Sequence, residues 1–329
     1  MSFSFVKRTP AYKPFLAWFC LFALVWITLL LFAGGWTTSI DAGMAFLDWP
    51  LSNGSLNPDG WTEDSSMLAE HSHRLLGAIL GTLSLILVFW TQLREERPWV
   101  RHLALALLIL VVLQGLLGGA RVLFDEQNHP DAENNALAQT FAILHALGAM
   151  LTLIVLVSLT TAVSRWWIER NVGLKGDASI ATQRYGLLLC FLILLQVVLG
   201  ATIRHQGVGL AIDNFPYATS SGSWLPDIWN WAVVLNFLHR AGAIVLTVVA
   251  ILFFVSIWRH PTTRHAFGRL ALIPLILIVL QIIIGGTVIW SDIHPHTATM
   301  HHLIGALLLG VTWLVAFASF RRPVELLLG

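Results

Sequence analysis

The sequence is short of charge and of cysteine. Charged side chains make up 11% of its 329 residues and apolar side chains 57%, and the mean hydropathy is +0.75. This composition exceeds what a soluble fold tolerates, so we expect an integral membrane protein. Its two cysteines, Cys20 and Cys190, lie inside apolar stretches, which excludes a disulfide framework or a thiolate metal site built from loop residues. The net charge of +1 excludes a nucleic-acid partner.

Eight apolar stretches are long enough to span a membrane. A helix of about 20 residues crosses roughly 30 Å of hydrocarbon. The sequence therefore predicts an all-α integral membrane protein with eight transmembrane helices. They centre on residues 16–35, 72–92, 103–121, 138–162, 185–204, 232–257, 270–290 and 299–319.

Basic residues are distributed unevenly between the loops. Most lysines and arginines lie before the first stretch, after the last, or in the loops that follow stretches two, four and six. The opposite loops contain no lysine, and the first two of them are acidic. Because basic loops concentrate on the cytoplasmic side, both termini are predicted to be cytoplasmic, in a bacterial plasma membrane. The exceptions to this pattern are Arg74, Arg121, Arg204 and Arg240.

Four stretches carry a histidine that is followed by glycine three or four residues later. An imidazole inside an apolar helix is costly unless something takes its nitrogen lone pair, and a glycine one turn away clears the surface that a flat macrocycle needs. The pattern therefore predicts haem, with enough histidines for two bis-histidine sites. The pairs are His73 with Gly77, His145 with Gly148, His239 with Gly242, and His302 with Gly305.

A second motif repeats between the two halves of the chain. Stretches three, five and seven contain glutamine followed four residues later by glycine, at 114–118, 196–200 and 281–285, and stretch one ends in a glycine pair. This repeat predicts two four-helix bundles related by a pseudo-twofold axis along the membrane normal. The predicted parts are residues 1–165, a cytoplasmic linker 166–179, and residues 180–329. His73 then faces His145, and His239 faces His302.

Two histidine doublets require a choice of ligand. Residues two apart lie on roughly opposite helix faces, so His71 and His73 cannot share one iron, and the spacing from the preceding glutamate favours His73. His301 and His302 differ by about 100° around the helix axis. The glycine three residues later favours His302.

The four exceptional arginines suggest carboxylate binding. A haem carries two propionates, and arginine holds carboxylates through paired hydrogen bonds. Arg74 and Arg240 directly follow histidines, so we expect them to hold propionates. Arg121 and Arg204 end the third and fifth stretches at matching positions; they either hold propionates or extend to lipid headgroups.

One acidic residue distinguishes the two bundles. Glu70 lies three residues before His73 and on the same helix face, whereas Asn236 takes that place before His239. A carboxylate beside a porphyrin edge can act as a base or stabilise developing positive charge, which asparagine cannot. We therefore expect a reaction site in the first bundle and an electron relay in the second. Alternatively, Glu70 belongs to the acidic outer loop or to the first turn of its helix.

These residues together resemble the haem A synthase family, membrane enzymes of cytochrome oxidase assembly. The resemblance rests on the four histidines, the Glu-x-x-His-Arg motif at 70–74, the His-Arg pair at 239–240, and the outer-loop segments 34–43 and 48–54. It implies that haem O, which carries a farnesyl tail, is oxidised at a ring methyl to the formyl group of haem A by successive hydroxylations, with haem b as prosthetic group. The implied roles are Glu70 as catalytic carboxylate, His73 and His145 as ligands of the substrate haem, and His239 and His302 as ligands of haem b.

Two other functions fit parts of the sequence. A di-haem electron carrier would leave Glu70 incidental, and a haem transporter or chaperone would use the tryptophan-rich segment 224–231. The histidine repeat favours stable ligation over transport, and the Glu/Asn difference favours catalysis. The first outer loop, with Trp36, Trp49 and Trp61, is expected to cover the first site, or else to form an aromatic belt at the membrane edge. Expected partners are haem O synthase, cytochrome oxidase assembly factors, an electron acceptor and lipid.

Overall fold

The computed structural model describes residues 11–128, 136–169 and 177–321. Within these residues the chain forms ten helices and no strand. Eight of the helices are long, and α5 (Arg165–Glu169) and α8 (Pro261–Phe267) are short. The long ones are α1 (Pro14–Ser39), α2 (Ser65–Arg94), α3 (Pro98–Leu123), α4 (Ala136–Val163), α6 (Asp177–His205), α7 (Trp231–Trp258), α9 (Leu272–Trp290) and α10 (Pro295–Ser319).

All eight long helices are long and apolar enough to cross a membrane. This confirms the predicted fold class and the predicted number of spans. Several helix ends are marked in the sequence. Pro14, Pro98 and Pro295 occupy the first helical turn, where a missing N–H costs nothing. Asp64 at the start of α2 and Asn230 at the start of α7 accept hydrogen bonds from backbone N–H groups of the first turn.

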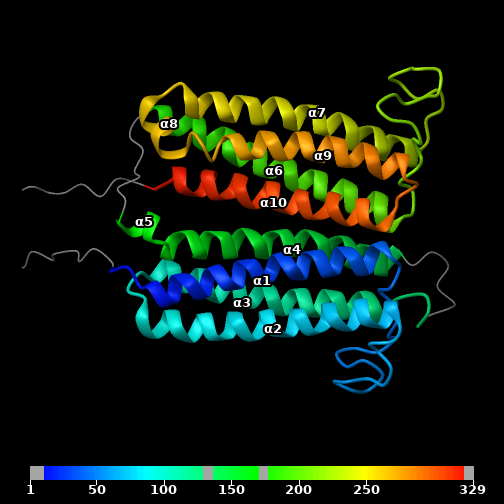
Figure 1. The fold of residues 1–329 in the computed structure, drawn as a ribbon, viewed down its shortest axis with the longest axis horizontal. Coiled ribbons are helices and arrows are strands. Elements are labelled where there is room, and N and C mark those ends of the chain that lie inside the picture. The colour runs from blue at the N-terminus through cyan, green and yellow to red at the C-terminus, as the bar shows by residue number, and fades with distance from the viewer. Residues whose placement is uncertain (1–10, 129–135, 170–176, 322–329) are drawn as a thin grey trace, which may run out of the picture.

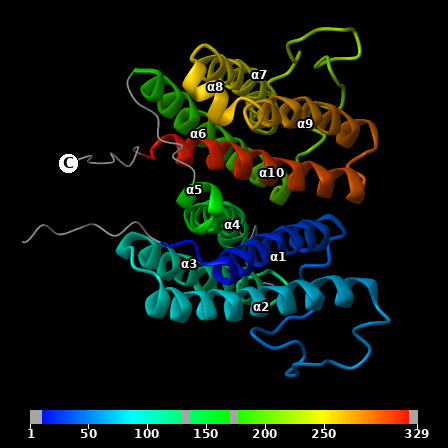
Figure 2. The same cartoon turned by 60° about the vertical axis from the view of Figure 1, so that its left-hand side comes forward.

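The long helices form two groups that lie side by side (Figure 1). We call α1–α4 the first bundle, and α6, α7, α9 and α10 the second bundle. Figure 2 shows α10 facing α1 and α4; α10 packs against both of these helices and α6 packs against α4, so these four helices form the junction between the bundles. One continuous core of buried side chains, including Leu156 and Phe253, extends through both bundles. The arrangement is consistent with the predicted repeat; the domain boundaries and the pseudo-twofold relation stay predictions.

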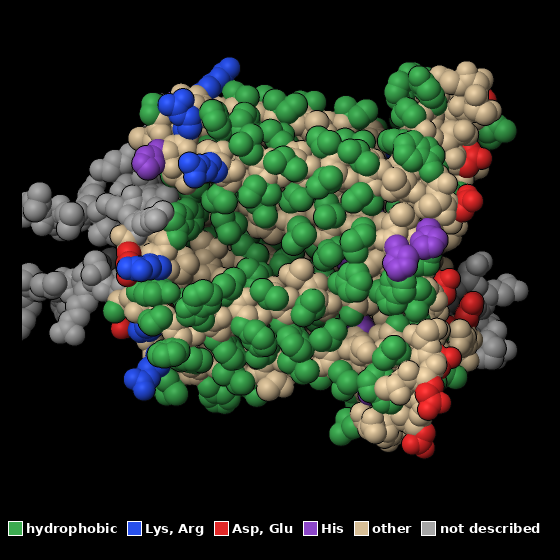
Figure 3. Space-filling model, viewed as in Figure 1, with side chains coloured by type: hydrophobic (Ala, Val, Ile, Leu, Met, Phe, Trp, Pro, Cys, Tyr) green, Lys and Arg blue, Asp and Glu red, His purple; other side chains and the backbone are tan. Residues whose placement is uncertain are grey.

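Charge is separated along the helix axes. Lysine and arginine side chains gather at one end of the molecule, and aspartate and glutamate gather at the other, where residues 40–64 and 206–230 project as loops (Figure 3). Large apolar side chains cover the sides of the helices between the two ends. This pattern suits a protein that spans a bilayer. We call the acidic end the loop end.

Candidate functional site

The first histidine pair lies between α2 and α4. The ring centres of His73 and His145 are 6.4 Å apart, and the ring planes are at 85°. Each ring rests on a glycine of a neighbouring helix: a Cβ added at Gly34 would come within 2.7 Å of Cε1 of His73, and one at Gly118 within 3.3 Å of Cε1 of His145. The structure therefore brings together the two residues that we expected in the first bundle.

The second pair lies between α7 and α10, but it differs from the one expected. His239 faces His301, with ring centres 6.2 Å apart and planes at 63°. A Cβ at Gly285 would come within 3.3 Å of Cε1 of His301, which repeats the support found under His145. His302 turns instead toward α1, where a Cβ at Gly35 would lie 3.0 Å from its Cδ2. The structure thus corrects the predicted partner of His239, because the rotation of α10 directs His302 to the junction between the bundles.

Both pairs fit a haem iron. Two imidazoles that bind one metal from opposite sides, each at about 2 Å, have ring centres roughly 6 Å apart. The Nδ1 atoms of all four rings are buried without a hydrogen-bond partner in the described part of the chain. In each ring Nδ1 lies nearer than Nε2 to the glycine that supports the ring, so Nδ1 faces a neighbouring helix and Nε2 is the nitrogen left to bind a metal. The four rings are those of His73, His145, His239 and His301.

The glycines that follow the histidines do not all serve the expected purpose. A Cβ at Gly148 would lie 2.0 Å from Nε2 of Gln114, and one at Gly242 would lie 1.9 Å from Nε2 of Gln196. Gly305 is packed in the same way, since a Cβ there would lie 2.6 Å from Nε2 of Gln281. These three glycines therefore make room for glutamines of the repeated motif. Only Gly77 has open space beside it, since a Cβ there would meet nothing within 4 Å.

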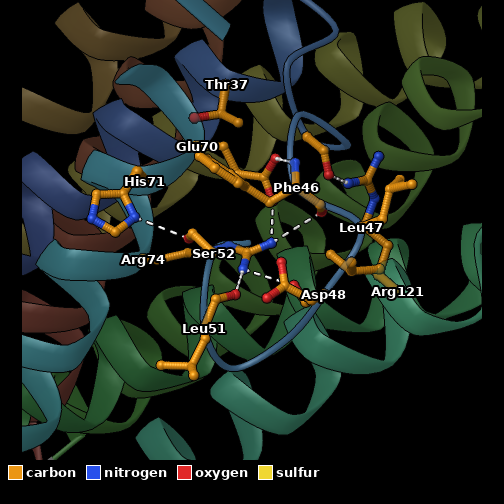
Figure 4. Close-up of polar contacts among 12 residues, drawn as sticks. Thr37, Phe46, Leu47, Asp48, Leu51, Ser52, Glu70, His71, Arg74 and Arg121 are labelled. Carbon is orange, nitrogen blue, oxygen red and sulfur yellow. Dashed lines mark hydrogen bonds and ion pairs between the residues drawn. The ribbon is translucent and has the colours of Figure 1, made fainter. Parts of the chain in front are cut away.

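Glu70 is held in a fixed position beside the first pair. Its side chain is 4% exposed. Oε1 accepts a hydrogen bond from Arg74 at 2.5 Å, and Oε2 accepts one from the backbone N–H of Phe46 at 3.0 Å (Figure 4). Asn236, at the same place in the second bundle, donates its Nδ2 hydrogens to the carbonyls of Val208 and Ala232. At this matched position the first bundle thus has a buried carboxylate and the second an amide, and each oxygen of the carboxylate keeps a lone pair that can face a ligand.

Arg74 and Arg240 bind the outer loops in matching ways. Each donates hydrogen bonds to three backbone carbonyls, which belong to the residues 28, 26 and 23 positions earlier in the chain. For Arg74 these residues are Phe46, Asp48 and Leu51; for Arg240 they are Ile212, Asn214 and Tyr217. The guanidiniums are therefore engaged with the loops rather than left free, and propionate binding by Arg74 and Arg240 stays a prediction.

Arg121 and Arg204 also contact backbone rather than extending outward. Arg121 donates to the carbonyl of Gly43 at 2.6 Å. Arg204 donates to the carbonyl of Gly35 at 2.8 Å and to Oγ of Ser39 at 2.5 Å, and so connects α6 of the second bundle to α1 of the first. Each guanidinium has five N–H groups, so donors remain for a carboxylate. A propionate role for either residue stays a prediction as well.

The loop of residues 40–64 covers the loop end of the first bundle. The ring of Trp49 packs where a Cβ at Gly119 would otherwise lie, and the ring centre of Trp61 is 4.7 Å from that of His71. Nδ1 of His71 lies 2.9 Å from Oγ of Ser52, so this histidine faces the loop and not His145. Figure 4 shows the contact between His71 and Ser52 beside Glu70.

The carboxylate of Asp48 holds a turn of this loop by accepting two backbone hydrogen bonds. Partial burial would raise the pKa of its carboxyl group, but hydrogen bonds from the backbone N–H groups of Gly54 and Asn53, together with the charge of Arg74, hold that pKa below its usual range. An ionised Asp48 thus fastens the turn at residues 53–54. This role was not predicted from the sequence, although an aspartate shortly before an Asn-Gly pair is a recognisable turn signal.

Comparison with known proteins identifies the family. Residues 17–313 match the family model COX15-CtaA, described as cytochrome oxidase assembly protein. The chain belongs to this family. Members similar to it include the heme A synthase of Symbiobacterium thermophilum, which is 32% identical over 77% of this chain and 78% of the relative. The heme A synthases of Geobacillus kaustophilus (25% identical over 94% of each chain) and Shouchella clausii (28% identical over 72% of this chain and 74% of the relative) are further members.

Proposed function

We propose that this chain is a haem A synthase, which oxidises a ring methyl of haem O to the formyl group of haem A for cytochrome oxidase assembly. The observation that carries the proposal is the buried Glu70 beside one of two similar histidine pairs. Family membership and the names of the relatives support it. A carrier of electrons between two equivalent haems would not need a carboxylate at one pair alone.

The two pairs are assigned to different haems. His73 and His145 hold the substrate haem O, next to Glu70. His239 and His301 hold haem b, whose iron supplies reversible one-electron chemistry when bound. His301 takes the role that the sequence analysis gave to His302, because His301 is the residue that faces His239.

Glu70 acts on the charge that develops at the methyl. Each hydroxylation removes two electrons from the porphyrin edge, which pass to the expected external electron acceptor, while water supplies the oxygen atom and two protons are released. The positive charge that develops at the edge is stabilised by a fixed anion without reorganisation. Two donors, Arg74 and the N–H of Phe46, keep the carboxylate oriented. A lone pair on either oxygen can also accept a proton from water that attacks the same carbon. After the second hydroxylation, loss of water from the geminal diol leaves the formyl group.

The protein spans the bacterial plasma membrane with its basic end in the cytoplasm. The separation of charge in Figure 3 supports this orientation, because basic residues flank spans on the cytoplasmic side. The start of α1 and the end of α10 lie at that basic end (Figure 1). The histidine pairs and Glu70 lie nearer to the loop end, in the outer half of the bilayer.

The first test of the proposal is Glu70→Gln. This substitution keeps the shape and the hydrogen bond from Phe46 but removes the charge, so we expect haem binding to persist and formyl production to fall by about 100-fold or more. Haems extracted from the purified protein and separated by chromatography measure both quantities. Glu95→Gln is the matched control, because Glu95 is also buried and bonded to an arginine, but at the basic end.

The wild-type protein gives the decisive contrast. Haem O or a hydroxylated derivative together with haem b supports the synthase. Haem b alone, in equal amounts at both pairs and with no formyl product, would instead indicate a di-haem electron carrier. An unchanged yield of haem A in Glu70→Gln would remove Glu70 from the mechanism.

A further inference from the structure

The loop of residues 206–230, in the second bundle, exposes more apolar surface than its counterpart in the first bundle. Five large apolar side chains, in the last part of this loop and at the start of α7, are between 48% and 76% exposed. We call them the tryptophan patch: Trp224, Leu225, Ile228, Trp229 and Trp231. In the loop of residues 40–64, the large apolar side chains that are exposed are only Leu47 and Leu56. The two loops therefore present different surfaces.

Ring contacts hold the patch in a defined arrangement. The ring centres of Tyr217 and Trp224 are 4.9 Å apart, with the ring planes at 63°. The ring of Trp229 packs on Phe237 of α7, with centres 5.0 Å apart and planes at 73°. Arg240, also on α7, holds the loop through three backbone carbonyls. The patch is thus a formed surface that stays exposed on the folded chain.

The loop that carries the patch has little charge. Its charged residues are Asp213 and Asp227, whereas the loop of residues 40–64 has five, all acidic: Asp41, Asp48, Asp59, Glu63 and Asp64. Charge is the main cost of placing a protein segment in a membrane. At the depth of the headgroups a single exposed carboxylate such as that of Asp227 still contacts water, so this cost is small for the second loop and larger for the first.

The indole groups of the patch are free to bind polar groups outside the protein. Within the described residues, no acceptor binds the N–H of Trp224, Trp229 or Trp231. In the first loop, by contrast, Nε1 of Trp61 donates to Oδ1 of Asn57 at 2.9 Å. An exposed indole with a free N–H suits the headgroup region of a bilayer, because its ring contacts acyl chains while its N–H binds headgroup oxygens or water.

The patch continues the lipid-facing sides of two spans. Trp231 begins α7, and the exposed side chains of Val234 and Leu238 follow it on the same helix face. Trp290, which ends α9 at the same end of the molecule, is 63% exposed. The loop extends sideways past α7 rather than along the helix axes (Figures 1 and 2), and Figure 3 shows hydrophobic side chains on it next to those that cover the helices.

We propose that the tryptophan patch inserts into the lipid headgroup region at the loop end, so that the loop of residues 206–230 is a lipid-contact surface. The loop of residues 40–64 stays in water over the first bundle. Lipid is the occupant that the structure favours, because it already surrounds α7 and α9, from which the patch continues, and because tryptophan is enriched at this depth of a membrane. The inference rests on the membrane spans and is independent of the proposed function.

The test places one spin label at matched positions in the two loops of the full-length protein, in nanodiscs of phosphatidylcholine and phosphatidylglycerol. Ile228→Cys and Leu56→Cys each provide one reactive thiol, because Ile228 is 76% exposed and Leu56 is 79% exposed, whereas Cys20 and Cys190 are buried. Oxygen concentrates in hydrocarbon and a nickel chelate stays in water, so the ratio of their collision rates with the label, from EPR power saturation, reports depth. We expect this ratio to be several-fold higher for Ile228→Cys than for Leu56→Cys.

Brominated lipid provides a second measurement that needs no label. Phosphatidylcholine with bromine in the upper part of its acyl chains quenches the fluorescence of tryptophans that contact lipid. Trp224→Phe/Trp229→Phe should therefore lower the quenched fraction of the emission relative to wild type. Trp49→Phe/Trp61→Phe is the matched control in the first loop and should not lower it.

Three outcomes overturn the inference. The first is equal, water-like collision ratios for the two labels, and the second is an unchanged quenched fraction in Trp224→Phe/Trp229→Phe. The third is a label at residue 228 that neither oxygen nor the nickel chelate reaches, which would show that a second copy of this chain covers the patch. None of these measurements involves haem, so their result leaves the proposed function to its own test.

Discussion

At the scale of single residues, the choice between His301 and His302 shows what spacing can and cannot decide. Glycine three residues later favoured His302, by analogy with His145 and His239. The structure shows that Gly305 accommodates Gln281, so the glycine does not mark which neighbouring histidine faces inward. The glycine that contacts each ring from a neighbouring helix distinguishes the two histidines better. Gly285 contacts the ring of His301, as Gly118 contacts the ring of His145.

This assignment gives a direct prediction for two adjacent histidines. His301→Leu should lose the haem of the second pair, because no other ring faces His239 among the described residues. His302→Leu should retain that haem, since its ring packs on Gly35 at the bundle junction. Absorption spectra of the two purified variants, with haem content from the pyridine haemochrome, provide the measurement. Loss of the haem in His302→Leu with retention in His301→Leu would restore the original assignment.

At the scale of elements, the two outer loops, residues 40–64 and 206–230, contact their own bundles in matching ways. Trp49 packs at Gly119 of α3, and Phe215 packs at Gly286 of α9. Few side chains agree between the two loops, apart from an aromatic-Pro pair 25 residues before each arginine, at 49–50 and 215–216. The arrangement of each loop is set by hydrogen bonds from an arginine on the helix that follows it, Arg74 on α2 for the first loop and Arg240 on α7 for the second.

The pKa of Asp48 predicts how the first loop responds to acid. A carboxyl group whose pKa is lowered by folding stabilises the folded loop above its unfolded pKa of about 3.9, and this contribution is lost as the pH falls through the folded pKa. We therefore expect Asp48→Asn to speed amide hydrogen exchange at residues 52–55 at pH 7. The difference from wild type should shrink below about pH 4, because a protonated aspartate resembles asparagine.

Hydrogen exchange with mass spectrometry, corrected for intrinsic rates at each pH, follows this loop. Asp59→Asn, at an exposed position in the same loop, is the control and should have no such effect. A difference between Asp48→Asn and wild type that stays constant down to pH 3 would show that the charge of Asp48 does not hold the turn.

At the scale of the whole molecule, a few polar contacts join the two bundles. Nε1 of Trp313 on α10 donates to Oγ of Ser158 on α4 at 2.7 Å. Ser39 on α1 contacts Thr299 on α10 through their hydroxyl groups and also accepts a hydrogen bond from Arg204. Together with the hydrogen bond from Arg204 to the carbonyl of Gly35, these contacts fix the position of one bundle against the other.

The contact between Trp313 and Ser158 predicts a measurable coupling. Ser158→Ala leaves the indole N–H without a partner in apolar surroundings, which should lower the free energy of unfolding by about 1–3 kcal/mol. In the double variant Ser158→Ala/Trp313→Phe, the loss of unfolding free energy should be smaller than the sum of the two single losses by about 1 kcal/mol. Thermal denaturation in detergent measures each variant. Thr247→Ala is the control, because its hydroxyl bonds only to its own helix, and simple additivity of the two substitutions would contradict the coupling.

Much of the architecture could be predicted from sequence, because membrane spans leave a strong local signal. The eight helices and the facing of His73 and His145 were predicted by apolar length and by motif spacing. The rotation of α10 was not, because it packs against both bundles and is apolar on several sides, so periodicity marks no single inner face. The arginine contacts also escaped prediction, since a hydrogen bond to a carbonyl leaves no trace in the identity of the accepting residue.

The arginine contacts have a consequence for how the two halves can change over time. Every residue supplies a carbonyl, so substitutions at positions 46, 48, 51, 212, 214 and 217 leave the acceptors of Arg74 and Arg240 in place. The two loops can therefore acquire unrelated compositions while each stays seated on its own bundle. In this way two bundles of one chain can acquire different loop side chains without any change in how the loops are attached.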